Sequence, residues 1–220
     1  MTNLFSSFDP MSSTFATQMN WLSTLLFLLI LFPMFWMTSS KPFMIYNEIS
    51  LYITKELFPL FKSYKNIILF NTLFLFILIN NLFGLMPYTF TSTAHIALTL
   101  SMALTIWLTF MIYGWVNNTN HMFAHLVPLG TPIILMPFMV IIETISNMIR
   151  PVTLSIRLAA NLTAGHLLLI LLGQSMVNMS IFIVMTVTMA QLTLLILEAA
   201  VAVIQSYVFT TLSTLYASEV

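Results

Sequence analysis

The chain has 220 residues and no formal net charge, only 5% of its residues are charged, and its mean hydropathy is +1.00. Soluble domains carry about 25% charged residues, so an ordinary soluble domain is excluded. Nucleic acid is not expected as a partner without a basic excess, and the lack of cysteine excludes disulfides and thiolate metal sites. Several uncharged apolar runs approach the roughly 20 residues that cross a bilayer. We therefore predict an all-α polytopic membrane protein, with residues 1–220 forming a single membrane domain in lipid.

Three apolar runs in the first half of the chain predict membrane spans that stand roughly perpendicular to the membrane plane. They cover residues 19–37, 66–86 and 94–116. The run over 43–58 differs because it is amphipathic, with Ile45, Ile49, Tyr52, Ile53 and Leu57 on one helical face. This pattern predicts an interfacial amphipathic helix on the membrane surface, and the alternative is a short soluble cap helix.

The distribution of lysine predicts the orientation of the chain. All four lysines, Lys41, Lys55, Lys62 and Lys65, lie between the first and second predicted spans. The positive-inside rule places that segment on the cytoplasm-equivalent side, so the N-terminus is expected on the opposite side. Five predicted crossings then place the C-terminus on the lysine side.

The last hundred residues predict a long helical hairpin over 132–172 and 176–217, turning near Gly173. Only Pro137 and Pro151 interrupt the first helix, and the second contains neither Gly nor Pro. A 40-residue helix is roughly 60 Å long, whereas the hydrocarbon core is only about 30 Å thick. The two helices are therefore strongly tilted or broken into shorter pieces, and we favour the tilted hairpin, with the effect of Pro151 left open.

Polar residues recur every seven positions on both helices of this hairpin. Glu143, Arg150 and Arg157 form one series, which Asn147 and Asn161 join, and Gln191, Glu198 and Gln205 form the other. Seven residues rotate a helix by only about 20°, so each series is a stripe on an apolar cylinder. Such a stripe avoids lipid only if it faces the other helix, another partner or water.

Arg157 is the most informative of these residues, because no acidic residue stands beside it or beside Arg150. Its helical neighbours Thr153, Leu154, Ala160 and Asn161 include no carboxylate. An arginine at the bilayer centre costs about 2.5–3.5 kcal/mol, and a guanidinium does not escape this cost by losing its proton. One interpretation is a packing arginine that pairs with Glu198 across the hairpin or reaches the interface. The other is a fixed positive charge that meets a mobile carboxylate.

The histidines give weaker signals. His166 lies nine residues after Arg157, about half a turn round the helix, and it is either a hydrogen-bonded core residue or, with Glu143 and Glu198, part of a proton relay. His121 and His125 have the spacing of a metal or haem pair, but they lie in a polar segment expected to be a loop without further ligands. No cofactor or metal is predicted. The chain also lacks a phosphate-binding loop and a nucleophile motif, so it is not expected to make or hydrolyse a nucleotide by itself.

The motif centred on Arg157 resembles subunit a of F-type ATP synthase, the proton-channel stator of the membrane sector. The residues concerned are SIRLAANLTAGHLLLILLG and the preceding VPLGTPIILMPFMVIIETISNMIRP. NLFGLMPYTF at residues 81–90 and the pair Glu198 and Gln205 are similar to that family too, so the resemblance covers nearly the whole chain. Bacterial members carry an acidic residue at the position of His166 and a histidine at that of Glu198, so the arrangement here is the mitochondrial one.

The resemblance implies a role for each matching residue. Arg157 is expected to be the essential arginine that faces the c-ring, with Asn161 close to it. His166 and Glu198, with Gln205 nearby, are expected to line a half-channel from the intermembrane space. Glu143 is expected to line the half-channel to the matrix.

The resemblance also implies partners and a location. The expected partners are the c-ring rotor subunits, other membrane-sector and peripheral-stalk subunits, and protons. The expected location is the mitochondrial inner membrane, with the N-terminus in the intermembrane space and the C-terminus in the matrix. Two other functions compete: a self-contained ion transporter, which predicts internal repeats that the sequence lacks, and a structural, haem-binding respiratory subunit, which predicts histidine pairs inside spans.

Overall fold

The structure is a computed structural model that describes residues 5, 8–11, 18–26, 41–60, 64–86, 89–127, 132–176 and 179–219. Every regular element in these ranges is a helix. The α-helices are α2 (Lys41–Leu57), α3 (Tyr64–Gly84), α4 (Ile96–Asn117), α5 (Thr119–His125), α6 (Met136–Ser175) and α7 (Ile181–Glu219). Short 3-10 helices are η2 (Met19–Leu26), η4 (Phe58–Leu60), η5 (Ser92–Ala94) and η6 (Ile133–Leu135).

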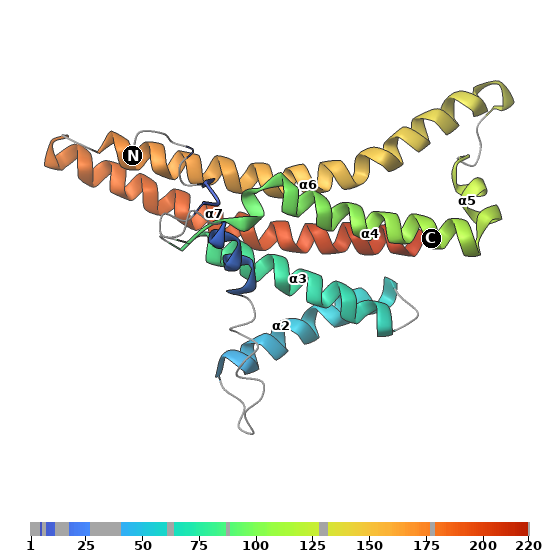
Figure 1. Ribbon diagram of the computed structural model, residues 1–220, viewed down its shortest axis with the longest axis horizontal. Coiled ribbons are helices and arrows are strands. Elements are labelled where there is room, and N and C mark those ends of the chain that lie inside the picture. Colours follow the sequence, from blue (N-terminus) through green and yellow to red (C-terminus); the bar gives the residue numbers. More distant parts are fainter. Residues whose placement is uncertain are drawn as a thin grey trace.

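The long helices α6 and α7 form an antiparallel hairpin that organises the rest of the chain (Figure 1). The α6–α7 turn lies at one end of the long axis, and α5 and the C-terminus lie toward the other end. Helix α4 packs on α6, and α3 packs on α7. The predicted hairpin is therefore present, with its turn after Ser175 rather than at Gly173.

Four of the described helices are long and apolar enough to cross a membrane, which confirms the predicted class of all-helical membrane protein. They are Asn66–Gly84, Ile96–Asn117, Met136–Ser175 and Ile181–Ser218. The expected first span over 19–37 begins in η2, and its residues 27–37 lie outside the described part of the chain. That span, the tilt of the hairpin and the orientation of the termini stay predictions.

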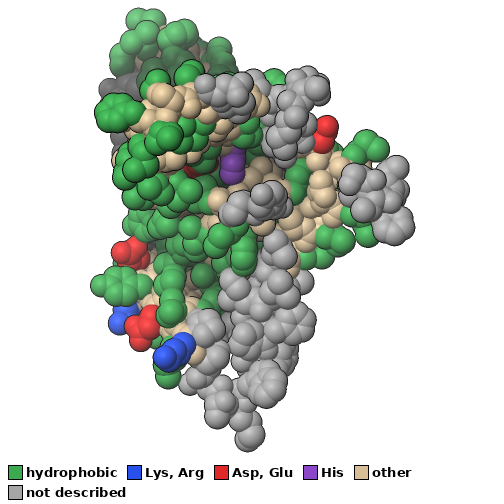
Figure 2. Space-filling model, turned by 90° about the vertical axis from the view of Figure 1, so that its left-hand side faces the viewer, with side chains coloured by type: hydrophobic (Ala, Val, Ile, Leu, Met, Phe, Trp, Pro, Cys, Tyr) green, Lys and Arg blue, Asp and Glu red, His purple; other side chains and the backbone are tan. Residues whose placement is uncertain are grey.

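Helix α2 uses only part of its predicted apolar face to pack on the protein. Ile53 and Leu57 near its end are buried against Phe70 and Phe74 of α3. Tyr52, from the same predicted face, is 72% exposed. The space-filling view shows charged side chains in its lower part and hydrophobic side chains over much of the described surface above them (Figure 2). A helix with one packed end and an exposed apolar remainder suits the predicted interfacial position.

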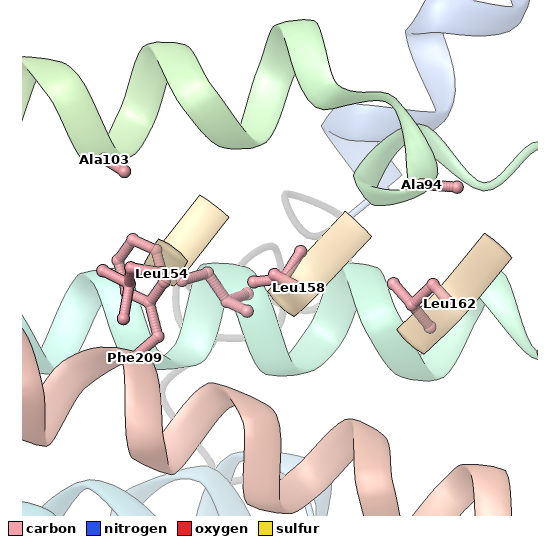
Figure 3. Packing of buried hydrophobic residues seen from close by; sticks show 7 residues of the cluster. Ala94, Ala103, Leu154, Leu158, Leu162 and Phe209 are labelled. Atoms are coloured by element: carbon pink, nitrogen blue, oxygen red, sulfur yellow. The ribbon is translucent and has the colours of Figure 1, made fainter. Parts of the chain in front are cut away.

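The rotation of α6 is fixed by a row of leucines in the core. Leu154, Leu158 and Leu162 follow one another at four-residue spacing and are buried with Phe209 of α7, Ile77 of α3, and Ala94 and Ala103 (Figure 3). The small side chains of Ala94 and Ala103 allow the backbones that face this row to approach closely. The leucine row therefore points one side of α6 inward and leaves the opposite side free for function.

Helix α6 is bent rather than straight. Figure 1 shows its N-terminal part sloping away from the line of the remainder. Pro151 lies inside the helix and is buried, and proline removes one backbone hydrogen bond and crowds the preceding turn. Sharp changes of helix direction have such an identifiable cause, so we attribute the bend to Pro151.

Truncating Phe209 should loosen the packing of α7 on the leucine row. We expect Phe209→Ala to lower the free energy of unfolding by about 3–5 kcal/mol, the usual cost of removing a buried aromatic ring. The measurement is the unfolding temperature of the helical signal in detergent. Ile204→Ala on the same helix is the control, because Ile204 is 59% exposed. An equal loss in both variants would contradict this assignment of the core.

Candidate functional site

The polar stripe of α7 faces α6 at three successive levels. Gln205 Oε1 accepts a hydrogen bond of 3.1 Å from Asn161 Nδ2. Gln191 Nε2 donates to the carbonyl of Leu169 over 3.5 Å. Between these levels, Oε1 of Glu198 lies 3.9 Å from His166 Nε2. The seven-residue repeat predicted from the sequence thus corresponds to a stripe that is turned inward, toward the partner helix.

Glu198 and His166 form a buried ionisable pair without further partners. Glu198 is 6% exposed, and among the described residues neither of its oxygens nor His166 Nε2 makes a hydrogen bond. A separation of 3.9 Å exceeds hydrogen-bond length. Buried polar atoms are normally bonded, and exceptions point to a function or to water. The pair is therefore placed to exchange protons through small movements or an intervening water.

Gly165 provides the space that Glu198 occupies. A Cβ atom built at Gly165 would overlap Oε1 of Glu198 and would also crowd its carboxyl carbon. The sequence of α6 alone does not predict this role of Gly165, because the clash is with a side chain on the other helix.

Arg157 lies on the exposed side of α6. Within the described residues it makes no ion pair and no hydrogen bond, and Glu198 lies beside His166 instead. Ala160 and Ala164 are exposed near it, whereas Ala159 is buried. The small residues therefore divide into a packing set and a smooth strip beside the arginine. The expectation that Arg157 could pair with Glu198 across the hairpin is not met here.

Arg150 differs from Arg157 in having partners on its own chain. Its guanidinium lies 3.5 Å from Glu143 Oε1 and 5.0 Å from the ring centre of Tyr216. No acidic residue stands beside Arg150 in the sequence, but Glu143 from the same predicted stripe is its partner in the structure. Glu143 lies seven residues earlier, outside the usual i±4 reach, and the two long side chains together with the bend at Pro151 bring the groups together.

Glu143 and Arg150 line a cavity of about 250 Å³ between α4, α5, α6 and α7. Its wall is mainly aromatic and apolar, and it includes Trp107, Trp115, His125 and Asn147. Arg157 follows Glu143 by fourteen residues and precedes His166 by nine, or about 21 and 13 Å along a helix. The structure therefore brings together Asn161 with Gln205, His166 with Glu198, and Glu143 with Arg150, and leaves Arg157 between the groups.

A second cluster of buried polar residues was missed by the sequence analysis. Asn81 of α3 is fully buried and donates from Nδ2 to the carbonyl of Ala202 on α7 over 3.5 Å. Asn80, Thr91, Ser92, Thr93 and Thr99 are also buried. The signal for this cluster was the consecutive pair Asn80 and Asn81 inside an otherwise apolar span. Through Asn81, this polar region connects α3 to the part of α7 that carries Glu198.

No metal or cofactor site emerges from the ionisable residues of this region. The described part of the chain contains no group of three or more His, Cys, Asp or Glu residues able to hold a metal ion. The ionisable side chains are instead spaced along the helix pair α6 and α7.

The fold and these residues define an all-helical membrane protein with ionisable groups between its helices and with Arg157 on the exposed side of α6. The family model described as ATP synthase A chain matches residues 17–218. The chain therefore belongs to the ATP synthase A chain family. It is 58% identical to ATP synthase subunit a of Drosophila melanogaster, covering 100% of this chain and 99% of the relative. The corresponding protein of Locusta migratoria is 52% identical over the same shares of both chains.

Filling the space at Gly165 should destabilise the hairpin. We expect Gly165→Ala to cost about 1–3 kcal/mol of unfolding free energy, because the new methyl group meets Glu198 in a packed site. Gly173→Ala is a matched control, since its nearest neighbour would be Gln191 Nε2 at 3.5 Å, an ordinary contact. That change should stabilise the helix by up to about 1 kcal/mol.

A double-mutant cycle tests the stated cause. In a Glu198→Ala background the cost of Gly165→Ala should disappear, because the overlapping carboxylate is absent. The measurement is unfolding temperature in detergent for the four chains of the cycle. Purely additive effects would show that Glu198 does not occupy the space at Gly165.

Proposed function

We propose that this chain is the stator proton-channel subunit of the membrane sector of F-type ATP synthase. In this role it supplies two offset half-channels and one essential arginine, and so couples proton flow to rotation and ATP synthesis. The observation that carries the proposal is Arg157, an exposed cation on a membrane helix with no partner among the described residues. A charge left in this state needs a counter-charge from another molecule.

The proposed partner of Arg157 is a carboxyl group on each subunit of a rotating c-ring. A carboxyl group that faces lipid stays neutral because burial disfavours its charged form. When rotation brings it to Arg157, the fixed positive charge favours ionisation and releases its proton. The exposed Ala160 and Ala164 beside Arg157 support this role, because small side chains let another helix pass closely.

His166, Glu198, Gln205 and Asn161 are proposed to form the half-channel from the intermembrane space. They lie on the facing sides of α6 and α7. The pair His166 and Glu198 lies between Arg157 and the hairpin turn, and the pair Asn161 and Gln205 lies close to the level of Arg157. Chains of acidic and histidine side chains inside a membrane are the usual components of proton relays. The unbonded atoms of Glu198 and His166 support a site where protons are passed on rather than held.

Glu143 is proposed to line the half-channel to the matrix. It borders the cavity of about 250 Å³ at the other end of α6, together with Asn147 and Arg150. The two half-channels are then separated along the helix by Arg157. A proton cannot pass directly between them without approaching a permanent cation, so it has to travel on the ring. Each proton supplies about 2.3 kcal/mol per 100 mV of membrane potential for rotation.

The proposal includes a location and an assembly. The chain would sit in the mitochondrial inner membrane as a multi-pass protein, with its N-terminus in the intermembrane space and its C-terminus in the matrix. The c-ring, further membrane-sector subunits and the peripheral stalk would surround it. The relatives from Drosophila and Locusta, which are named ATP synthase subunit a, support this assembly.

Removing the charge of Arg157 should prevent the complex from coupling ATP hydrolysis to proton transport. We expect Arg157→Ala to abolish ATP-driven proton pumping in reconstituted vesicles, because no fixed charge then ionises the ring carboxyl groups. Arg157→Lys should rescue only part of the activity, since a buried ammonium can lose its proton. Ile156→Ala is the control, because it truncates an exposed neighbour without changing charge. Normal pumping by the Arg157→Ala complex would refute the proposal.

Neutralising Glu198 should slow proton flux without preventing assembly. Glu198→Gln keeps the size of the side chain but removes its ability to bind and release a proton, so we expect a lower rate of both pumping and ATP synthesis. Glu48→Gln on α2 is the matched control, because Glu48 is exposed and distant from the hairpin stripe. Flux equal to that of the unmodified complex would remove Glu198 from the proton path.

A further inference from the structure

Helix α5 carries two histidines in a chelating arrangement outside the proposed proton path residues. His121 and His125 are four positions apart in the helix Thr119–His125, and their ring centres lie 4.8 Å from each other. The sequence alone suggested a loop here, in which this spacing has no geometric meaning. On a helix the same spacing places both imidazoles on one face, as in the paired histidines of zinc-binding helices.

Both imidazoles lie on the surface of the chain. His121 and His125 are exposed, and neither ring nitrogen has a hydrogen-bond partner or an acidic neighbour among the described residues. Neutral imidazole is the commonest protein ligand for transition metals. Two histidines without a third protein ligand favour a metal that accepts water in its remaining positions, and Cu²⁺ binds nitrogen ligands more strongly than the other divalent first-row ions.

His125 connects this pair to the cavity that holds Glu143 and Arg150. It lines that cavity together with Met122 from the same helix. Trp115 also lines it and contacts Phe123 of α5 edge-on, with ring centres 5.0 Å apart. A cation bound by α5 would therefore lie at the edge of the cavity. The fluorescence of Trp115, which lines the same cavity, is expected to change when the cation binds.

We propose that His121 and His125 form a binding site for Cu²⁺ or Zn²⁺, and that an ion bound there slows proton exchange through the Glu143 cavity. The bound ion adds positive charge at the edge of the cavity, which opposes the approach of protons. It also ties the ends of α5 together and so restricts movement of His125 at the cavity wall. The inhibitory half of this proposal rests on the proposed function, whereas the binding half does not.

The test uses the assembled complex in liposomes with Cu²⁺ as the probe. Binding is read by electron paramagnetic resonance, in which two imidazole ligands give a two-nitrogen splitting, and by quenching of tryptophan fluorescence. His121→Gln should abolish the two-nitrogen signal and weaken binding by at least about tenfold. His121 does not line the cavity, so pumping without metal should be unchanged. Asn120→Gln, an exposed neighbour on α5, is the matched control and should retain the signal.

Transport is measured in the same preparations. Cu²⁺ added on the side where ATP is hydrolysed should inhibit ATP-driven pumping by the unmodified complex and by Asn120→Gln, and His121→Gln should need at least about tenfold more metal. ATP hydrolysis by the detached catalytic sector controls for metal effects elsewhere.

The outcomes separate the two proposals. A two-nitrogen signal that is absent, or that persists in His121→Gln, overturns the metal site whatever the pumping rate. A signal lost in His121→Gln, with pumping insensitive to metal in every variant, upholds the metal site. That result overturns the inhibition and counts against the Glu143 cavity as a proton path.

Discussion

The contact between the polar stripe of α7 and one side of α6 is the constraint on which the site depends. Glu198 and Gln205 lie on a helix that is otherwise apolar, and neither could face lipid without a large cost. Both are buried against α6, where Asn161 bonds Gln205 and Gly165 leaves room for Glu198. This pairing fixes the rotation of each helix about its own axis, and the leucine row on α6 fixes it again through α3 and α4.

Once that rotation is fixed, the position of Arg157 follows. His166 lies half a turn from Arg157, so a helix that turns His166 toward Glu198 turns the arginine outward. The two arginines of α6 show how local geometry gives identical side chains different partners. Arg150 lies near the bend and is neutralised by Glu143 and covered by Tyr216. Arg157 lies on the straighter part, beyond the reach of any described carboxylate, and its charge is available to a partner.

Periodicity and composition were sufficient to predict the helical membrane class, the long hairpin and the inward stripe of α7, because each depends on a repeat within one helix. They placed Glu143 and Arg150 on one stripe but did not predict their contact, since the usual helical ion pairs are three or four residues apart. The role of Gly165 and the contact from Asn81 to Ala202 depend on the register between helices, which single-helix patterns do not contain. Helix α5 was missed because a seven-residue polar segment gives almost no hydrophobic signal.

The unusual length of α6 has a physical reason if one helix must carry both ends of the proposed path. Glu143 and His166 are twenty-three residues apart, or roughly 35 Å along a straight helix, and a tilted helix spreads this distance partly along the membrane plane. Each group can then lie near a different water phase, while Arg157 stays in the apolar region between them. A helix of ordinary span length would bring the two groups within one continuous polar region, and protons could cross without the ring. Under the proposed function, the length of α6 and its polar stripe would both help to keep the two aqueous paths apart.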